Sequence, residues 1–178
     1  MSLQLLLIST MLPVYIPLQF FEKSNNNFEI PITWQIPTII LLTLIFHKKI
    51  VFWAFSIYII LGLFIFQVFH QGGSIGYLLT PNFGYLLGIY PLINIIDKLN
   101  TRNKINVGNF LKNGFIAIGA MHLTGIFYNF IQVIFYSQFN IFLYNLGKYS
   151  VGKIGYHILM LFPLLLLIKP IKHLKHSK

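Results

Sequence analysis

Residues 71–88 of the chain read Gln-Gly-Gly-Ser-Ile-Gly-Tyr-Leu-Leu-Thr-Pro-Asn-Phe-Gly-Tyr-Leu-Leu-Gly. Five glycines and one proline interrupt this stretch, and the tetrapeptide Gly-Tyr-Leu-Leu occurs in it twice, at 76–79 and at 84–87. Glycine lets a backbone approach another backbone or a ligand closely, and Pro81 biases Thr80 away from the helical conformation. The stretch therefore predicts a bent or re-entrant segment that turns into a tightly packed helix.

Two roles remain open for the glycines of this stretch. Irregular backbone at membrane depth is tolerated where protein buries it or where it lines a cavity, which makes Gln71, Gly72 and Gly73 candidates for a binding site. Gly84 and Gly88 also have the spacing of a face on which two helices pack. For these two glycines, helix packing and site lining are equally good interpretations.

The composition is that of an integral membrane protein. Of the 178 residues, 56% are hydrophobic and 9% are charged, and the mean hydropathy is +0.73. A soluble domain has about 25% charged residues. The chain has no cysteine, which excludes disulfides, thiolate metal sites and thiol catalysis. The net charge of +10 comes from residues between apolar segments, so it indicates orientation and contact with anionic lipid and does not indicate nucleic-acid binding.

Apolar residues predict six membrane-spanning helices in one domain covering residues 1–178. We expect the spans at 1–20, 32–46, 50–69, 75–96, 114–136 and 153–168, with the fourth bent at Pro81 and again at Pro91. The fold class is therefore all-α. Polar loops are expected at 22–31, 97–113 and 137–152, and the first span is interpreted as a retained helix because it lacks a basic segment and a small-residue cleavage site.

The basic residues predict which side of the membrane holds the termini. With six spans both termini lie on one side, and ten of the 13 Lys and Arg residues fall there: Lys48, Lys49, Lys98, Arg102, Lys104, Lys112, Lys169, Lys172, Lys175 and Lys178. The other three, Lys23, Lys148 and Lys153, fall on the opposite side. The positive-inside rule then places both termini in the cytoplasm and makes the glycine-rich stretch part of an outward-facing pocket.

Few titratable residues are available for chemistry inside the membrane. The three acids Glu22, Glu29 and Asp97 all fall in predicted loops, so hydrolase, protease and carboxylate-relay carrier functions are disfavoured and we expect no enzymatic activity. Within spans, His122 is either an interhelical hydrogen-bonding residue or a ligand-binding one, the former being commoner. His157 follows Lys153 by four residues and so shares its helical face.

Lys153 opens the predicted last span on the outer side. It either extends its ammonium group to interfacial water or binds an anionic solute from outside. Gln35, beside Trp34 at the outer start of the second span, would add a neutral donor and acceptor.

Three segments resemble the BioY family. Ile30-Pro31-Ile32-Thr33-Trp34-Gln35 is similar to the Val-Pro-Ile-Thr-x-Gln entry to that family's second helix, and residues 71–88 resemble its Gly-Gly…Leu-Leu-Gly-Pro-Thr-Gly-Gly-Tyr-Leu-x-Gly signature. Residues 123–128, Leu-Thr-Gly-Ile-Phe-Tyr, are a weaker echo of its fifth helix. The similarity is clearest over 29–96 and looser towards the C-terminus.

The resemblance implies a fold, a solute and a set of partners. BioY proteins are biotin-binding S-components of energy-coupling-factor (ECF) transporters, which implies a six-helix bundle, biotin as the transported substrate, and no bound cofactor. It also implies docking to a transmembrane coupling subunit with two ATPase subunits, in a bacterial plasma membrane. The chain has no Gly-x4-Gly-Lys-Ser/Thr phosphate loop, so only partner subunits would use ATP.

The chain departs from the family pattern at the start of the last helix. The family's Gly-Asp-x-x-Lys is Gly152-Lys153-Ile154-Gly155-Tyr156 here, and its Gly-Pro-Thr-Gly-Gly is Thr80-Pro81-Asn82-Phe83-Gly84. Either the cation has moved by one helical turn, with Tyr156 as a neutral donor, or biotin binds weakly, or the solute is another anionic vitamin. A structural membrane protein without transport, whose glycines serve helix packing, is the alternative from a different class.

For biotin, each chemical part of the solute has candidate partners. Lys153 would bind the carboxylate, and Gln71, Asn82 and Tyr156 would hydrogen-bond the polar groups. Tyr77, Tyr85 and Trp34 would cover the ring, while Gly72, Gly73, Gly84 and Gln35 complete the predicted site.

Overall fold

The computed structural model describes residues 1–14, 32–66, 68–69, 73–102, 106–136 and 139–167. The first half contains α1 (Ser2–Met11), a two-stranded antiparallel pair of β1 (Pro13–Val14) with β2 (Ile32–Thr33), α2 (Gln35–Ile45) and α3 (Lys48–Phe64). The second half contains the 3₁₀ helix η2 (Ile75–Leu79), α4 (Pro81–Leu87), α5 (Ile89–Arg102), α6 (Val107–Tyr136), α7 (Phe139–Asn145), the π-helix η3 (Leu146–Val151) and α8 (Gly152–Leu159). The described chain is almost entirely helical, as the composition predicts.

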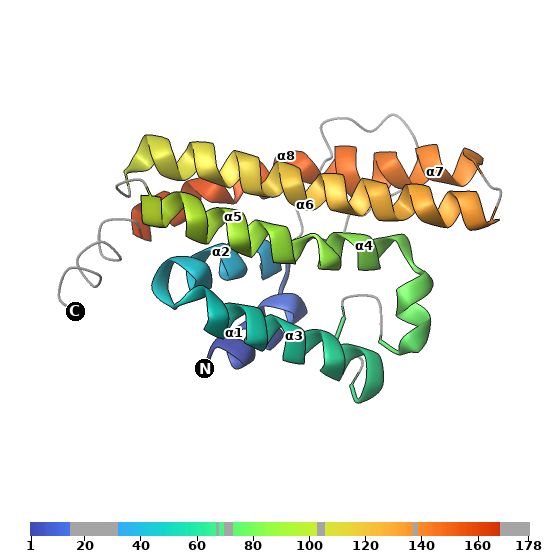
Figure 1. Ribbon diagram of the computed structural model, residues 1–178, viewed down its shortest axis with the longest axis horizontal. Coiled ribbons are helices and arrows are strands. Elements are labelled where there is room, and N and C mark those ends of the chain that lie inside the picture. The colour runs from blue at the N-terminus through green and yellow to red at the C-terminus, as the bar shows by residue number, and fades with distance from the viewer. Residues whose placement is uncertain (15–31, 67, 70–72, 103–105, 137–138, 168–178) are drawn as a thin grey trace.

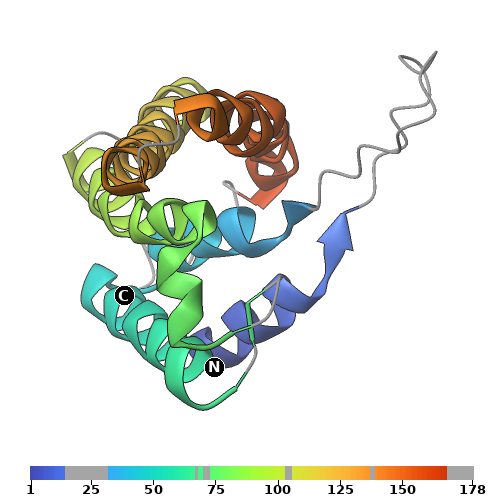
Figure 2. The same ribbon diagram turned by 90° about the vertical axis from the view of Figure 1, so that its right-hand side faces the viewer.

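These helices form three layers (Figure 1). α6 lies beside the helix made of α7, η3 and α8, while α4 and α5 run end to end beneath α6 and pack along it. α1, α2 and α3 make the third layer, in which α2 contacts α5 and α1 contacts α3. The end view in Figure 2 shows β1 and β2 side by side at the edge of this bundle.

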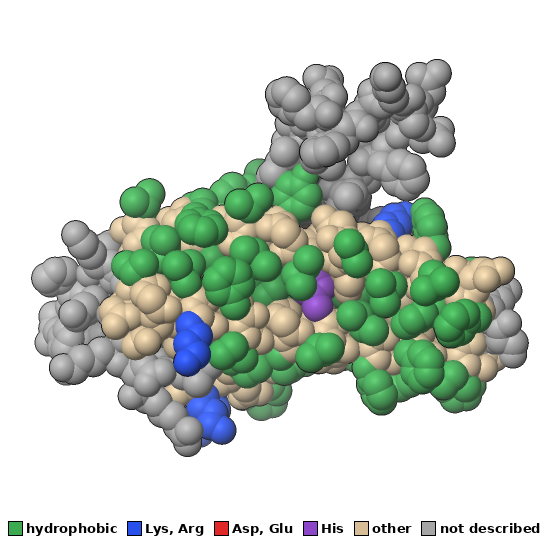
Figure 3. Space-filling model, turned by 90° about the horizontal axis from the view of Figure 1, so that it is seen from above, with side chains coloured by type: hydrophobic (Ala, Val, Ile, Leu, Met, Phe, Trp, Pro, Cys, Tyr) green, Lys and Arg blue, Asp and Glu red, His purple; other side chains and the backbone are tan. Residues whose placement is uncertain are grey.

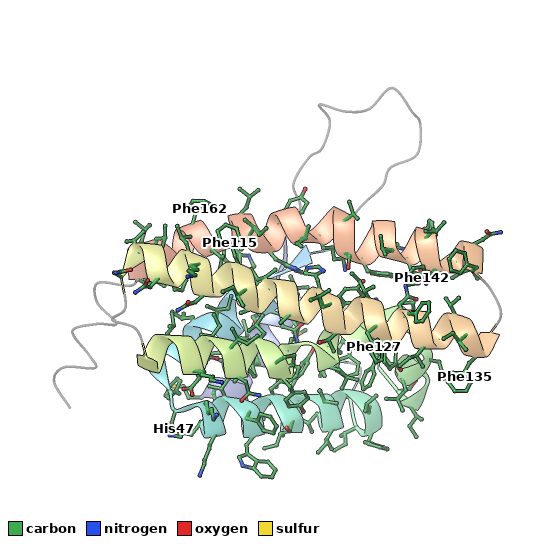
Figure 4. The ribbon with its side chains drawn as sticks, turned by 45° about the horizontal axis from the view of Figure 1, so that its top comes forward. His47, Phe115, Phe127, Phe135, Phe142 and Phe162 are labelled. Carbon is green, nitrogen blue, oxygen red and sulfur yellow. The ribbon has the colours of Figure 1, made fainter. Side chains whose placement is uncertain are left out.

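Among the described residues, two helices are long and apolar enough to cross a membrane by themselves, Val107–Phe135 and Phe139–Leu167. Each has 29 residues, against the roughly 20 that a bilayer requires. The face of the molecule formed by these helices carries many apolar side chains (Figure 3), and the labelled residues Phe127 and Phe135 of α6 are exposed (Figure 4). An apolar surface of this extent suits contact with lipid.

The predicted bend of the fourth span at Pro81 is confirmed. Thr80 has φ −89° and ψ 146°, which ends η2, and Pro81 takes the first position of α4, where its missing N–H costs no hydrogen bond. A second break separates α4 from α5, but it falls at Gly88 and not at Pro91. Pro91 lies in the first turn of α5, where proline is tolerated.

Several predicted span boundaries are wrong. α1 ends at Met11 and not near residue 20, because Pro13 favours an extended conformation at Leu12, which has φ −93° and ψ 97°. α3 ends at Phe64, short of residue 69. The predicted loop at 97–113 is much shorter, because α5 continues to Arg102 and α6 begins at Val107, where the Asn106 side chain accepts a hydrogen bond from the Asn109 N–H at 2.7 Å. The predicted polar loop at 22–31 lies outside the described residues.

The last span differs most from its prediction. Residues 139–152, expected to be mostly loop, are helical, so the span begins at Phe139 and not at Lys153. Lys153 consequently lies at the midpoint of the helix Phe139–Leu167. The correction moves this cation from the mouth of the span to its centre.

Candidate functional site

A cavity of about 100 Å³ lies where all three layers meet. Residues from both halves of the chain line it: Thr10, Thr33, Gln35, Ile36, Tyr58, Phe69, Tyr77, Asn82, Tyr85, Leu86, Ile89, Met121, Tyr149, Lys153 and His157. Its wall is mixed, with aromatic and aliphatic side chains beside amide, hydroxyl, imidazole and ammonium groups. That mixture is typical of a pocket for a small amphipathic molecule.

Lys153 supplies the positive charge of this cavity. The side chain is partly buried, and its Nζ lies 5.2 Å from the centroid of the Tyr149 ring. Within the described part of the chain, Lys153 forms no ion pair, and the described acid Asp97 lies 4.0 Å from Lys48 instead. A cation at mid-span without a carboxylate partner favours binding of an anion.

The opposite wall carries neutral polar groups from the first three helices. Gln35 has a buried Nε2 with no hydrogen-bond partner among the described residues. Tyr58 is almost fully buried beside it, and Thr10 donates to the Leu7 carbonyl at 2.8 Å. Since a buried donor without a partner is costly, Gln35 is suited to donate a hydrogen bond to an acceptor on a ligand.

A hydrogen-bonded chain of four side chains runs behind the cavity wall. Tyr85 OH lies 2.8 Å from Ser150 Oγ, and Ser150 Oγ lies 3.2 Å from His122 Nδ1. His122 Nε2 in turn lies 3.0 Å from His157 Nδ1. The chain joins α4, η3, α6 and α8.

The π-helix η3 brings two of these residues inward. Its wider turn contains Tyr149 and Ser150, both buried, directly before the helical turn that carries Lys153. π-turns inside α-helices occur frequently at functional sites because the extra residue changes which side chains face inward. In this chain it allows Ser150 to reach His122 while Lys153 faces the cavity.

Five of the eleven site residues predicted from the sequence line the cavity together: Gln35, Tyr77, Asn82, Tyr85 and Lys153. Trp34 precedes α2 and is 38% exposed, while Gly73 and Tyr156 also lie outside the lining. Gly84 packs against the Tyr128 side chain of α6 and not on the cavity. Gln71 and Gly72 lie outside the described residues.

The other residues that line the cavity were mostly not predicted from the sequence. His157 carried one signal, its i, i+4 spacing from Lys153, which does place both on one helical face. Thr10, Tyr58 and Tyr149 had no signal, because an isolated hydroxyl in an apolar span is as compatible with simple packing as with a site.

The fold and the cavity define a helical membrane protein with a central polar pocket and a cation in the middle of its last span. The particular family follows from comparison of the sequence: the chain belongs to the BioY family, whose model matches residues 2–165. This agrees with the resemblance found in the second-helix entry and the glycine-rich signature.

Comparison of the structure gives a similar protein of known fold. A crystal structure described as the S-component for biotin from an ECF-type ABC transporter superposes with a TM-score of 0.62 and 18% sequence identity. The match covers 94% of this chain and 87% of the other. At this identity the likeness establishes that the two chains share a fold. Comparison with curated proteins gives no match.

Proposed function

We propose that this chain is the substrate-binding subunit of a biotin transporter, a single-domain S-component that captures biotin from outside a bacterial cell. Membership of the BioY family supports the solute, and the fold of the similar S-component supports the class. Lys153 is the observation that carries the proposal: a cation in a mixed polar and aromatic cavity, at mid-span, with no ion-pair partner among the described residues. It would bind the biotin carboxylate.

The other parts of biotin match the remaining wall. Tyr77, Tyr149 and Phe69 offer aromatic faces for the thiophane ring and the valeryl chain. Asn82 and Gln35 offer amide groups that can hydrogen-bond polar groups of the solute. The roles expected for Trp34 and Tyr156 would require these side chains to move towards the cavity when biotin binds.

Energy for uptake would come from other subunits. We infer a transmembrane coupling subunit and two ATPase subunits, as the family implies, because the chain has no phosphate loop of its own. Both termini would lie in the cytoplasm. The contact of Lys48, at the α2–α3 turn, with Asp97 near the end of α5 supports this topology, since it brings two segments predicted to be cytoplasmic together.

A second candidate is an S-component for a different anionic vitamin. The replacement of the family's Gly-Asp-x-x-Lys by Gly152-Lys153-Ile154-Gly155-Tyr156 favours it, because the cation remains while the acid is lost. Isothermal titration of detergent-purified protein with biotin separates the two candidates. Saturable heat at one biotin per chain supports the first. Absence of heat, together with an unchanged unfolding temperature, would leave the second.

A further inference from the structure

The hydrogen-bonded chain begins and ends on the cavity wall, but its middle does not touch the cavity. Tyr85 and His157 line the cavity, whereas Ser150 and His122 are outside the lining and only 5% and 3% exposed. The two cavity-facing ends are therefore connected through two side chains that no ligand can reach. The ring centroids of Tyr85 and His122 lie 5.6 Å apart and those of His122 and His157 lie 5.2 Å apart, so ring packing holds these side chains in place.

The number of hydrogens in this chain restricts what its ends can offer. Each neutral member carries one hydrogen on oxygen or ring nitrogen, which gives four hydrogens for three links. Both imidazoles are taken as neutral, because a second buried cation beside Lys153 would lack a counter-ion. When all three links are satisfied without using other partners, one hydrogen remains, and it is located at one end unless Ser150 accepts in both of its links.

Two arrangements satisfy all three links and also use the hydroxyl hydrogen of Ser150; a third, in which Ser150 accepts from both Tyr85 and His122, leaves that hydrogen without a partner at a residue only 5% exposed, which is costly. In the first, Tyr85 donates to Ser150, Ser150 to His122 and His122 to His157, so His157, which lines the cavity, keeps its Nε2–H as an unused donor and the Tyr85 oxygen remains an acceptor. In the second, every link is reversed, so His157 Nε2 is an acceptor and the Tyr85 hydroxyl is a donor. In both arrangements the cavity wall presents one donor and one acceptor.

We propose that this Tyr85–Ser150–His122–His157 chain is the element that determines specificity for the head of the solute, selecting a neutral group that carries both a donor and an acceptor. A cyclic urea has this property, since its carbonyl accepts and its two N–H groups donate. The inference rests on the proposed function and deepens it, because it assigns the ureido end of biotin to Tyr85 and His157 and leaves the carboxylate to Lys153. Sites built to hydrogen-bond a substrate reject analogues that leave a buried partner unsatisfied.

Matched ligands and matched variants test the proposal. 2-Iminobiotin keeps the carboxylate and the ring but has a guanidinium head that only donates, so the parent protein should bind it at least tenfold more weakly than biotin. Ser150→Ala interrupts the chain without changing the cavity wall and should raise the Kd for biotin roughly tenfold, while reducing the ratio between the two ligands. Ser56→Ala removes an equivalent serine–tyrosine hydrogen bond, to Tyr90 at 2.9 Å and away from the cavity, and should leave both affinities unchanged.

The protonation pattern of the hydrogen-bonded chain can be measured directly by NMR. Nitrogen NMR of labelled histidine in reconstituted protein distinguishes the two imidazole tautomers of each ring. Addition of biotin, or of 2-imidazolidinone, which has the urea but no carboxylate, should shift the ring signals of His122 and His157 together. Ser150→Ala removes the partner of His122 Nδ1 but keeps the direct His122–His157 hydrogen bond, so the two rings should still shift together, while their tautomer ratio before ligand is added should differ from that of the parent protein.

The outcomes separate the two hypotheses. A shift of the histidine signals with 2-imidazolidinone, in a protein that does not bind biotin, would support the role of the hydrogen-bonded chain and contradict the biotin function. Biotin could bind without changing the histidine signals, and Ser150→Ala could leave the ratio of the Kd values for biotin and 2-iminobiotin unchanged. That result would contradict the role of the hydrogen-bonded chain and leave the biotin function standing. Absence of any histidine response to either ligand would also contradict the chain.

Discussion

Tyr85 of α4 packs its ring against Gly125 of α6, while the neighbouring Gly84 receives the Tyr128 side chain from α6 in return. The Tyr128 hydroxyl then donates a hydrogen bond to the Leu78 carbonyl at the end of η2. Each helix thus inserts a tyrosine into the space that a glycine leaves on the other. This reciprocal contact fixes the position of Tyr85, and with it one end of the hydrogen-bonded chain at the cavity.

Replacement of Gly84 by leucine should disrupt this contact. Even a Cβ at Gly84 would overlap the Tyr128 side chain, and overpacking of this kind costs about 1–3 kcal/mol. We expect a lower unfolding temperature in detergent and weaker biotin binding. Gly119→Leu on α6 is the matched control, since nothing lies within 4 Å of a Cβ built there. Equal stability of the two variants would show that α4 and α6 do not pack in this way.

Lys153→Ala should weaken biotin binding by roughly 2–5 kcal/mol, the range for removal of one partner from a buried charge pair. Lys153→Arg should be partly tolerated, because it keeps the charge. Lys148→Ala is the control, since Lys148 also approaches the Tyr149 ring, at 5.4 Å, but does not line the cavity. Isothermal titration of the purified variants measures each affinity.

Biotin methyl ester completes a double cycle with Lys153→Ala. The ester should bind the parent protein poorly and lose little further affinity in the variant, because both changes remove the same interaction. Additive losses would show that Lys153 does not contact the carboxylate and that another residue does.

The orientation in the membrane can be measured with single cysteines, because the natural chain has none. Ser74 and Val107 are both exposed. Ser74 precedes the fourth span and Val107 begins the fifth, so the two residues are expected on opposite sides of the membrane. A cysteine at Ser74 should react with a membrane-impermeant thiol reagent added to whole cells, and one at Val107 should react only after lysis. The opposite pattern would reverse the predicted topology.

Transport by the isolated chain should not be concentrative. Since no phosphate loop is present, liposomes containing this protein alone should accumulate no biotin above the outside concentration, with or without internal ATP. Addition of the coupling subunit and the ATPases should make uptake ATP-dependent. Accumulation against a gradient by the protein alone would contradict the proposed division of labour.

Local chemistry explains which features could be predicted from the sequence. The break at Thr80–Pro81 was predictable because proline restricts its neighbour wherever it occurs. The roles of Gly84 and Gly88 were not, because close approach to a helix and close approach to a solute require the same absent side chain. The structure places a Cβ at Gly88 against the Met121 backbone, so helix packing accounts for both glycines.

The chemistry of the site depends on contacts between distant segments. His122 and His157 are 35 residues apart, and neither lies at a metal-binding or catalytic spacing within its own helix, so their 3.0 Å contact has no signal in the sequence. Lys153 was placed at the wrong depth because Asn145, Gly147 and Lys148 have the composition of a loop. In the structure Asn145 is buried and donates to the Asn129 side chain at 3.3 Å, which keeps this polar segment helical.

The π-helix Leu146–Val151 holds one residue more than an α-helical turn needs at this point of the last span. One residue fewer would let the turn close with α-helical hydrogen bonds, and Phe139–Asn145 would keep nearly its present angle to Gly152–Leu159. The Asn145–Asn129 contact and the orientation of Lys153 and His157 towards the cavity could then be kept together, but Tyr149 and Ser150 would lose their inward position. A single deletion before Tyr149 would thus separate Tyr85 from His122 while leaving the anchoring of this helix and its cavity-facing lysine and histidine in place.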